Sequence, residues 1–147
     1  MNNYEPCIKS CFDITRKDSP GINASILELV DNCIGWGKST YININYDKCS
    51  KILTIKDNGV GFINIESLHR FFKLGKTNEH VNSKTIGKYG MGGYRATINI
   101  GENVSIKTNI DNIVYSIGTN FEEMINNNNW TPTNKICVLD NTNIEGT

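Results

Sequence analysis

Residues 28–62 read ELVDNCIGWGKSTYININYDKCSKILTIKDNGVGF, and this stretch decides the fold class. It begins inside an amphipathic helix and continues through two runs of β-forming residues, 41–46 and 51–56, which a polar connection joins. It ends on the glycine-punctuated segment 57–62. A helix followed by an antiparallel hairpin predicts an α/β (α+β) two-layer sandwich, with helices covering one face of a mixed, mainly antiparallel sheet.

The same patterns predict the elements on either side. Ser19 is a candidate N-cap and Pro20 a candidate first-turn residue for the helix, which should end near Gly35. Its buried face is predicted from apolar residues spaced three or four positions apart: Ile22, Ile26, Leu29, Val30 and Cys33. Downstream, the sequence predicts a short helix over 67–74, a polar candidate lid over 75–85, a helix from near Met91 to Gly101, strands over 104–108, 113–117 and 135–139, and mostly loop over 121–134.

Composition sets the broad class. The chain has 147 residues, of which 38% are hydrophobic and 20% charged, so we expect a single domain over 1–147 with an N-terminal extension over 1–18. Its 15 basic and 15 acidic residues cancel, and nucleic-acid binding is therefore not indicated. No apolar run is long enough to span a membrane and no signal-peptide pattern opens the chain, so an intracellular location, cytoplasmic or nuclear, is expected. Five cysteines without paired spacing and two histidines predict reduced thiols and no zinc site.

The first motif that carries chemistry is Glu28-Leu29-Val30-Asp31-Asn32. Residues four apart stack on one helix face, so Glu28 and Asn32 should point into the same small volume. A carboxylate suits the task of orienting or deprotonating water, and a carboxamide oxygen suits Mg²⁺. Taken alone, the pair fits an ordinary solvated helix face better than a catalytic site.

The second motif is Asp57-Asn58-Gly59-Val60-Gly61-Phe62, at the end of a strand. The Asp57 carboxylate can accept a hydrogen bond from an exocyclic amine such as that of adenine, and Gly59 and Gly61 would let backbone approach a flat ring. Asn-Gly after a β-run is also a leading turn signal, so a plain hairpin turn is the alternative.

The third motif, IGKYGMGGYRAT over 86–97, is a glycine-rich loop that feeds into a helix. Free amides at a helix N-terminus bind phosphate oxygens. The spacing matches neither the P-loop nor the dinucleotide-binding fingerprint, and by itself the segment is equally consistent with a flexible loop. The occurrence of all three motifs in this order is stronger evidence for a nucleotide site than any one of them alone.

These residues in this order resemble the GHKL (Bergerat-fold) ATPase superfamily, which includes type II topoisomerase ATPase domains, MutL, ninety-kilodalton heat-shock chaperones, MORC proteins and histidine kinases. The likeness covers residues 19–147, and LGKTNE followed by IGKYGMGG looks closest to the MORC and heat-shock-chaperone branch. By this resemblance ELVDN is the N-box, DNGVGF the adenine box, IGKYGMGG the phosphate box and the terminal Glu145-Gly146-Thr147 the final Gly-Thr motif.

The resemblance implies bound ATP and Mg²⁺, and a role for each matching residue. Glu28 would be the catalytic residue that activates or orients water, Asn32 the magnesium ligand and Asp57 the adenine anchor, with support from Thr147. The remaining cofactor-binding candidates are glycines and neighbours of the adenine and phosphate boxes: Gly59, Gly61, Gly87, Gly90, Met91, Gly92 and Gly93. Lys76 and Lys88 are further candidates for phosphate contact. One departure is Cys33-Ile34-Gly35-Trp36, where relatives carry Ala-x-Asp-Ala after the N-box Asn.

The function expected from these features is binding and slow hydrolysis of Mg-ATP as a conformational or dimerisation switch, with a homodimer or another protein as partner. Three alternatives stay open: a non-hydrolysing nucleotide-binding or assembly module, a histidine-kinase-type catalytic domain, and a ligand-free structural domain. Against the kinase, the box reads GMGGY and the sequence shows no upstream helical segment with an acceptor histidine.

Overall fold

The computed structural model describes residues 7–72, 92–133 and 135–139. The described elements in chain order are α1 (Ile8–Lys17), α2 (Ile22–Gly35), β1 (Ile42–Asp47), β2 (Ile52–Asp57), α3 (Ile65–Phe71), α4 (Gly92–Ile100), β3 (Asn103–Ile110), β4 (Ile113–Asn120), α5 (Phe121–Asn126) and β5 (Cys137–Leu139). The α/β class expected from the sequence is confirmed. The candidate lid over 75–85 lies outside the described residues.

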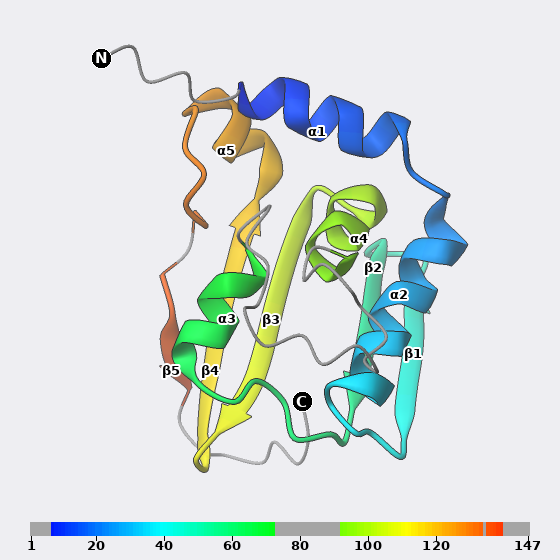
Figure 1. Cartoon of the computed structure of the whole chain (residues 1–147), viewed down its shortest axis with the longest axis vertical. Coiled ribbons are helices and arrows are strands. Elements are labelled where there is room, and N and C mark those ends of the chain that lie inside the picture. The colour runs from blue at the N-terminus through cyan, green and yellow to red at the C-terminus, as the bar shows by residue number, and fades with distance from the viewer. Residues whose placement is uncertain (1–6, 73–91, 134, 140–147) are drawn as a thin grey trace.

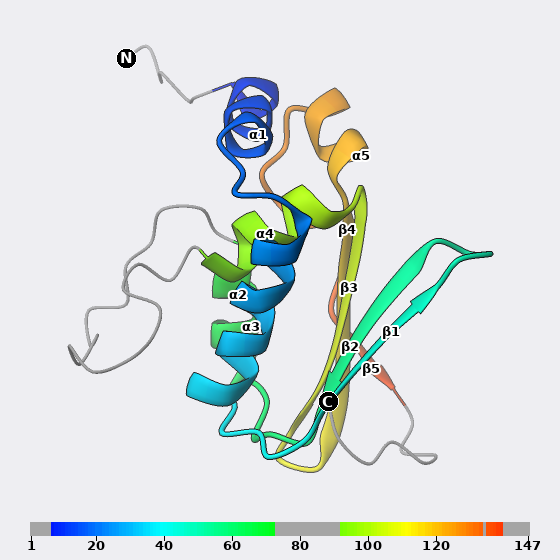
Figure 2. The same ribbon diagram turned by 90° about the vertical axis from the view of Figure 1, so that its right-hand side faces the viewer.

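The described strands form two antiparallel sheets. β1 and β2 make the predicted hairpin, in register from Ile42 opposite Asp57 to Asp47 opposite Ile52. The second sheet has the order β3-β4-β5, with Ile106 opposite Ile117 near its middle. Both sheets are visible in Figure 1, and Figure 2 shows the hairpin leaning away from β3 and β4.

Helices α2, α3 and α4 lie on one side of the β3-β4 pair, as expected for a two-layer sandwich (Figure 2). The burial of residues along β3 alternates, as expected for a strand with one covered face. Residues 104, 106, 108 and 110 are buried or half-buried, whereas 105, 107 and 109 are exposed. The core between the layers consists of Ile8, Phe12, Leu68, Phe72, Tyr94, Ile98, Ile117, Phe121 and Met124. Tyr94 donates its hydroxyl to Met124 Sδ at 3.9 Å, and burial raises the pKa of that hydroxyl.

Helices α1 and α5 close one end of the sandwich and contact each other there (Figure 1). The stretch expected to be an extension thus contains a helix whose Ile8 and Phe12 are fully buried, with the Phe12 ring 5.3 Å from that of Phe121. The prediction of loop after position 120 was wrong for α5. Asn120 caps this helix by accepting from the Glu123 amide at 2.7 Å, and acidic residues in its first turn favour a helix start.

The start of α2 also differs from the prediction. The N-cap is Gly21, whose φ of 100° suits glycine, and the helix begins at Ile22. The Ser19 hydroxyl accepts from the Gly21 amide at 3.1 Å and does not cap the helix. Ile22, placed on the buried face by its spacing, is 58% exposed at the first position of the helix.

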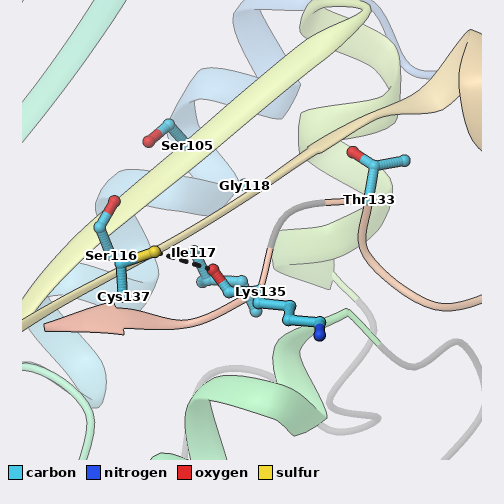
Figure 3. Close-up of a pocket in the computed structure, with 7 residues that line it drawn as sticks. All are labelled: Ser105, Ser116, Ile117, Gly118, Thr133, Lys135 and Cys137. Carbon is cyan, nitrogen blue, oxygen red and sulfur yellow. Dashed lines mark hydrogen bonds between the residues drawn. The ribbon is translucent and has the colours of Figure 1, made fainter.

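The other face of the β3-β4-β5 sheet is polar. A shallow depression of about 360 Å³ there is lined by Ser105, Ser116, Ile117, Gly118, Thr133, Lys135 and Cys137 (Figure 3). Within this depression the Cys137 thiol donates to the Lys135 carbonyl at 3.5 Å.

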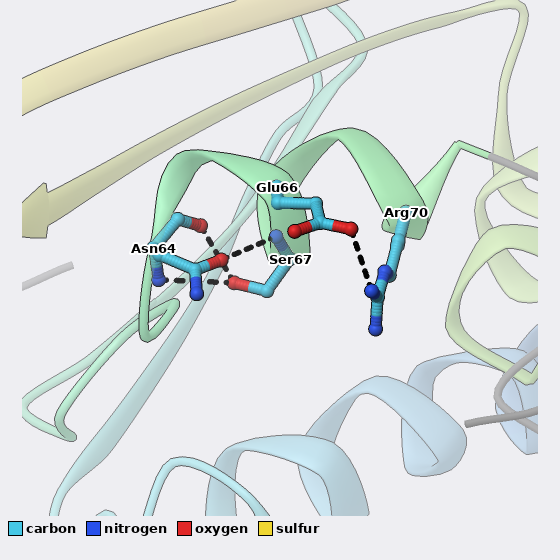
Figure 4. Close-up of polar contacts among 4 residues, drawn as sticks. All are labelled: Asn64, Glu66, Ser67 and Arg70. Carbon is cyan, nitrogen blue, oxygen red and sulfur yellow. Dashed lines mark hydrogen bonds and ion pairs between the residues drawn. The ribbon is translucent and has the colours of Figure 1, made fainter. Parts of the chain in front are cut away.

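Helix α3 begins at Ile65, two residues before the predicted start, because Asn64 and Ser67 form a reciprocal cap. Asn64 Oδ1 accepts from the Ser67 amide at 2.8 Å, and the Asn64 amide donates to Ser67 Oγ at 3.2 Å (Figure 4). Arg70 pairs with Glu66 one turn away at 2.6 Å. Leu68 of this helix is fully buried in the core. Among the helices in the described ranges, none is long and apolar enough to cross a membrane.

Candidate functional site

Helix α2 presents the Glu28-Asn32 pair to the first residues of α4. Both side chains are partly buried. A Cβ placed on Gly92 would collide with the Glu28 carboxylate, and one on Gly93 would lie 3.1 Å from Asn32 Nδ2 and 2.7 Å from the Phe71 ring. The absence of side chains at Gly92 and Gly93 is therefore what lets the acid and the amide lie against the amino end of α4.

Asp57 ends β2 and faces the last turn of α2. Its Oδ1 accepts from the Ser39 hydroxyl at 2.7 Å and from the Gly59 amide at 2.8 Å. Its Oδ2 accepts from the Cys33 thiol at 3.6 Å, and Cys33 follows Asn32 directly in the chain. The Asp57 carboxylate thus contacts the residue of α2 that directly follows Asn32.

The loop between α2 and β1 is fastened to the glycine segment by a second set of bonds. Asn58 Oδ1 accepts from the amides of Thr40 and Tyr41 at 3.0 and 2.9 Å, and Asn58 Nδ2 donates to Thr40 Oγ1 at 3.0 Å. The Val60 amide donates to the Gly37 carbonyl at 2.8 Å. We call the contacts of Asn58 with Thr40 and Tyr41 the Asn58 latch.

The far end of the glycine segment is fastened to the second sheet. Gly61 has a φ of 66°, in the left-handed region that favours glycine. The Phe62 amide then donates to the hydroxyl of Thr108 on β3 at 3.2 Å, and Thr108 is 1% exposed. The segment is therefore anchored at both ends, to the α2-β1 loop and to β3.

Cys33 is protonated at neutral pH. Burial, the neighbouring Asp57 charge and the hydrogen bond between them raise the pKa of its thiol from 9.0 to about 11. The group is consequently an S–H donor to Asp57 and a poor nucleophile. Cys33 is the first of the residues that depart from the Ala-x-Asp-Ala pattern of relatives.

The structure brings Glu28 to Gly92, Asn32 to Gly93 and Asp57 to Gly59, and the Cys33 thiol joins Asp57 to α2. Gly61 lies further along the glycine segment, next to the residue that bonds Thr108. The candidates Lys76, Gly87, Lys88, Gly90, Met91 and Thr147 lie outside the described residues. Sequence reasoning did not single out Ser39 or Thr108, because a lone serine in a loop and a threonine in a strand carry no signal of their own. The depression of Figure 3 is lined by none of the motif residues.

Comparison with known proteins agrees with this arrangement. The family model described as "Histidine kinase-, DNA gyrase B-, and HSP90-like ATPase" matches residues 21–142, which include α2 through β5. The chain is also similar to the chaperone protein HtpG of Wigglesworthia glossinidia brevipalpis, with 38% identity over 79 residues. That alignment covers 46% of the chain and 12% of the relative, so the chain matches only a small part of the relative's length. Three motifs converging on α2 and a match over most of the sequence show that the chain belongs to the histidine kinase-, DNA gyrase B- and HSP90-like ATPase family.

Proposed function

We propose that this site binds Mg-ATP and hydrolyses it slowly, and that bound nucleotide acts as a conformational or dimerisation switch. The observation that carries the proposal is the position of α2. One helix holds Glu28 and Asn32 against the start of α4, and its next residue, Cys33, contacts Asp57. Residues 28–33 of α2 therefore contact both the Asp57 carboxylate, which can accept a hydrogen bond from adenine, and the amino end of α4, which can bind phosphates.

The adenine would bind at Asp57. The carboxylate stands at the end of β2, held in place by Ser39 and by the Gly59 amide. A carboxylate accepts hydrogen bonds only, so it recognises a donor such as the exocyclic amine of adenine. Gly59 next to it has no side chain, which lets the Gly37 carbonyl and the Ser39 hydroxyl approach the Asp57 carboxylate closely.

The phosphates would bind at the amino end of α4. The first amides of a helix have no partner within the helix, and the helix dipole makes this end attractive to anions. Gly92 and Gly93 open α4, and their lack of side chains lets Glu28 and Asn32 stand directly beside this end of the helix. The nine residues of α4 lie largely buried in the core, which fixes its direction.

Asn32 fits the role of a magnesium ligand. Mg²⁺ takes oxygen ligands and usually keeps several waters while it bridges phosphates, so a single carboxamide oxygen close to the phosphate site is a suitable protein contribution. Asn32 is beside Gly93, at the end of α4 where the phosphates are proposed. When bound, the ion would offset the negative charge of the phosphates.

Glu28 is the candidate for activating water. Its carboxylate lies against Gly92, at the terminus where the last phosphate would be held. A carboxylate there can accept a proton from water or orient it for in-line attack. Slow turnover fits a switch, in which the bound state lasts long enough to alter pairing with a second copy or a protein partner.

Nucleotide-dependent stabilisation tests the binding proposal. A ligand that binds only the folded state raises the free energy of unfolding by about 2.7 kcal/mol at a hundredfold excess over its Kd. We expect the thermal unfolding midpoint to rise with ATP and Mg²⁺, to rise less when EDTA removes the metal, and to rise least with GTP and Mg²⁺. An unchanged midpoint at millimolar ATP and Mg²⁺ would contradict the proposal.

A further inference from the structure

The inference concerns Ser39 and rests on the proposed function. Ser39 lies in the loop between α2 and β1, and the Asn58 latch and the Val60–Gly37 bond hold this loop on the glycine segment. The Ser39 amide also donates to the Cys33 carbonyl at 3.0 Å, which joins the loop to the end of α2. The backbone of Ser39 is therefore fixed by contacts that do not involve its hydroxyl.

The two oxygens of Asp57 have different surroundings. Oδ1 accepts from the Ser39 hydroxyl and from the Gly59 amide, at 2.7 and 2.8 Å. An sp² oxygen has two lone pairs, so these donors fill it. Among the described residues, Oδ2 accepts from the Cys33 thiol at 3.6 Å, and a thiol is a weak donor. Oδ2 therefore retains capacity to accept a further hydrogen bond.

We propose that Ser39 is a positioning residue that sets the base selectivity of the site. By saturating Oδ1, its hydroxyl fixes the rotation of the Asp57 carboxylate and leaves Oδ2 as the oxygen offered to the ligand. A purine with an amino group at the recognised position donates to Oδ2. A purine with an oxo group there places acceptor against acceptor, which is repulsive.

Removal of the hydroxyl should loosen this selection without unfolding the loop. In Ser39→Ala the carboxylate keeps the Gly59 amide but loses a bond made to a charged acceptor, which is one of the stronger kinds. The carboxylate can then rotate, and part of the binding free energy of an amino purine is used to fix it again. We expect ATP affinity to fall about tenfold and GTP affinity to stay within about twofold, so the preference for ATP falls about tenfold.

The experiment is calorimetric titration of Mg-ATP and Mg-GTP into the full chain and its variants, with urea unfolding of each. Ser39→Thr keeps the hydroxyl and should restore the preference. Ser50→Ala is the matched control, because the Ser50 hydroxyl donates to the Asp47 carboxylate at 2.7 Å in the turn between β1 and β2 and not to Asp57. It should leave the preference at the wild-type value. If Ser39→Ala unfolds, Ser39→Cys replaces it, since it conserves size while weakening the donor, and an intermediate preference is then expected.

The outcomes separate this inference from the proposed function. A wild-type chain that binds no adenine nucleotide overturns both. If the wild type binds ATP and Asp57→Asn loses it, while Ser39→Ala keeps the wild-type preference, the role of Ser39 is wrong and the proposed function stands. Equal losses of ATP and GTP affinity in Ser39→Ala would show a merely structural residue and would also overturn the inference.

Discussion

Glu28→Gln should bind Mg-ATP within about twofold of wild type and lose turnover by at least about a hundredfold. The amide has nearly the same shape as the carboxylate, so the contact with Gly92 is retained. It cannot take a proton from water, however, and general-base contributions are typically about 10² to 10⁴ in rate. The measurement is phosphate release at saturating Mg-ATP, paired with calorimetric affinity. Glu28→Ala, which removes the contact as well, should show the same separation of binding from turnover.

Glu66→Gln is the matched control for this prediction. Glu66 is an exposed carboxylate on α3 that pairs with Arg70 and belongs to none of the three motifs. The same chemical change there should leave both affinity and rate unaltered. A Glu28→Gln variant that hydrolyses ATP at the wild-type rate would show that Glu28 is not the residue that activates water. A wild-type chain that binds ATP without any turnover would favour the non-hydrolysing module.

Gly59→Ala should damage both the stability and the affinity of the chain. An added Cβ would collide with the Gly37 carbonyl and come within 2.5 Å of Ser39 Oγ and 2.7 Å of Asp57 Oδ1. The carbonyl belongs to backbone that bonds Val60, so it cannot yield without breaking the loop contact. We expect a loss of about 2 kcal/mol in the free energy of unfolding, in the range of other overpacking changes. ATP affinity should fall at least about tenfold, because the Asp57 carboxylate must move.

Gly35→Ala provides the comparison for Gly59→Ala. Gly35 is the last residue of α2, and a Cβ there meets no atom within 4 Å. Alanine is a better helix former than glycine, so this substitution should be neutral or slightly stabilising. Urea unfolding of the two variants isolates the steric effect at Gly59. Equal stabilities would mean that the close approach of the α2-β1 loop to the glycine segment is incorrect.

The sequence is sufficient to predict those parts of the fold that follow from local patterns. The four-residue spacing of Glu28 and Asn32 is a helix property, and the β1-β2 hairpin follows from two β-forming runs around a polar connection. The strands predicted before and after position 111 are present as β3 and β4, and each is longer than predicted. In each case neighbours in the sequence determine the structure.

The predictions of secondary structure and burial were wrong where a weak local signal determined the structure. The start of α2 depended on Gly21 adopting a positive φ, which displaced Ser19 from the capping position. Helix α5 was predicted as loop, although Asn120 and the acidic first turn were present in the sequence as start signals. Ile22 repeats with the helical period but lies at the exposed end of its helix.

The contacts of Ser39 could not be predicted from the sequence because they are tertiary. Its hydroxyl meets Asp57 only when the α2-β1 loop folds back onto the end of β2, and the Asn58 latch makes that happen. The position of Glu28 against Gly92 likewise requires α2 and α4 to pack together. Motif order indicated which residues belong to one site, while the structure supplied their partners.

Calorimetric titration of Mg-ATP into the wild-type chain and into Asp57→Asn tests the central claim most directly. The substitution keeps the size of the side chain but replaces the charged acceptor with a neutral amide, and it turns one of the two oxygens into a donor. We expect micromolar to millimolar binding by the wild type and a loss of at least about tenfold in the variant, with unfolding curves that show both chains folded. Equal affinities in the two chains, or no binding by the folded wild type, would contradict the assignment of this site to adenine nucleotides.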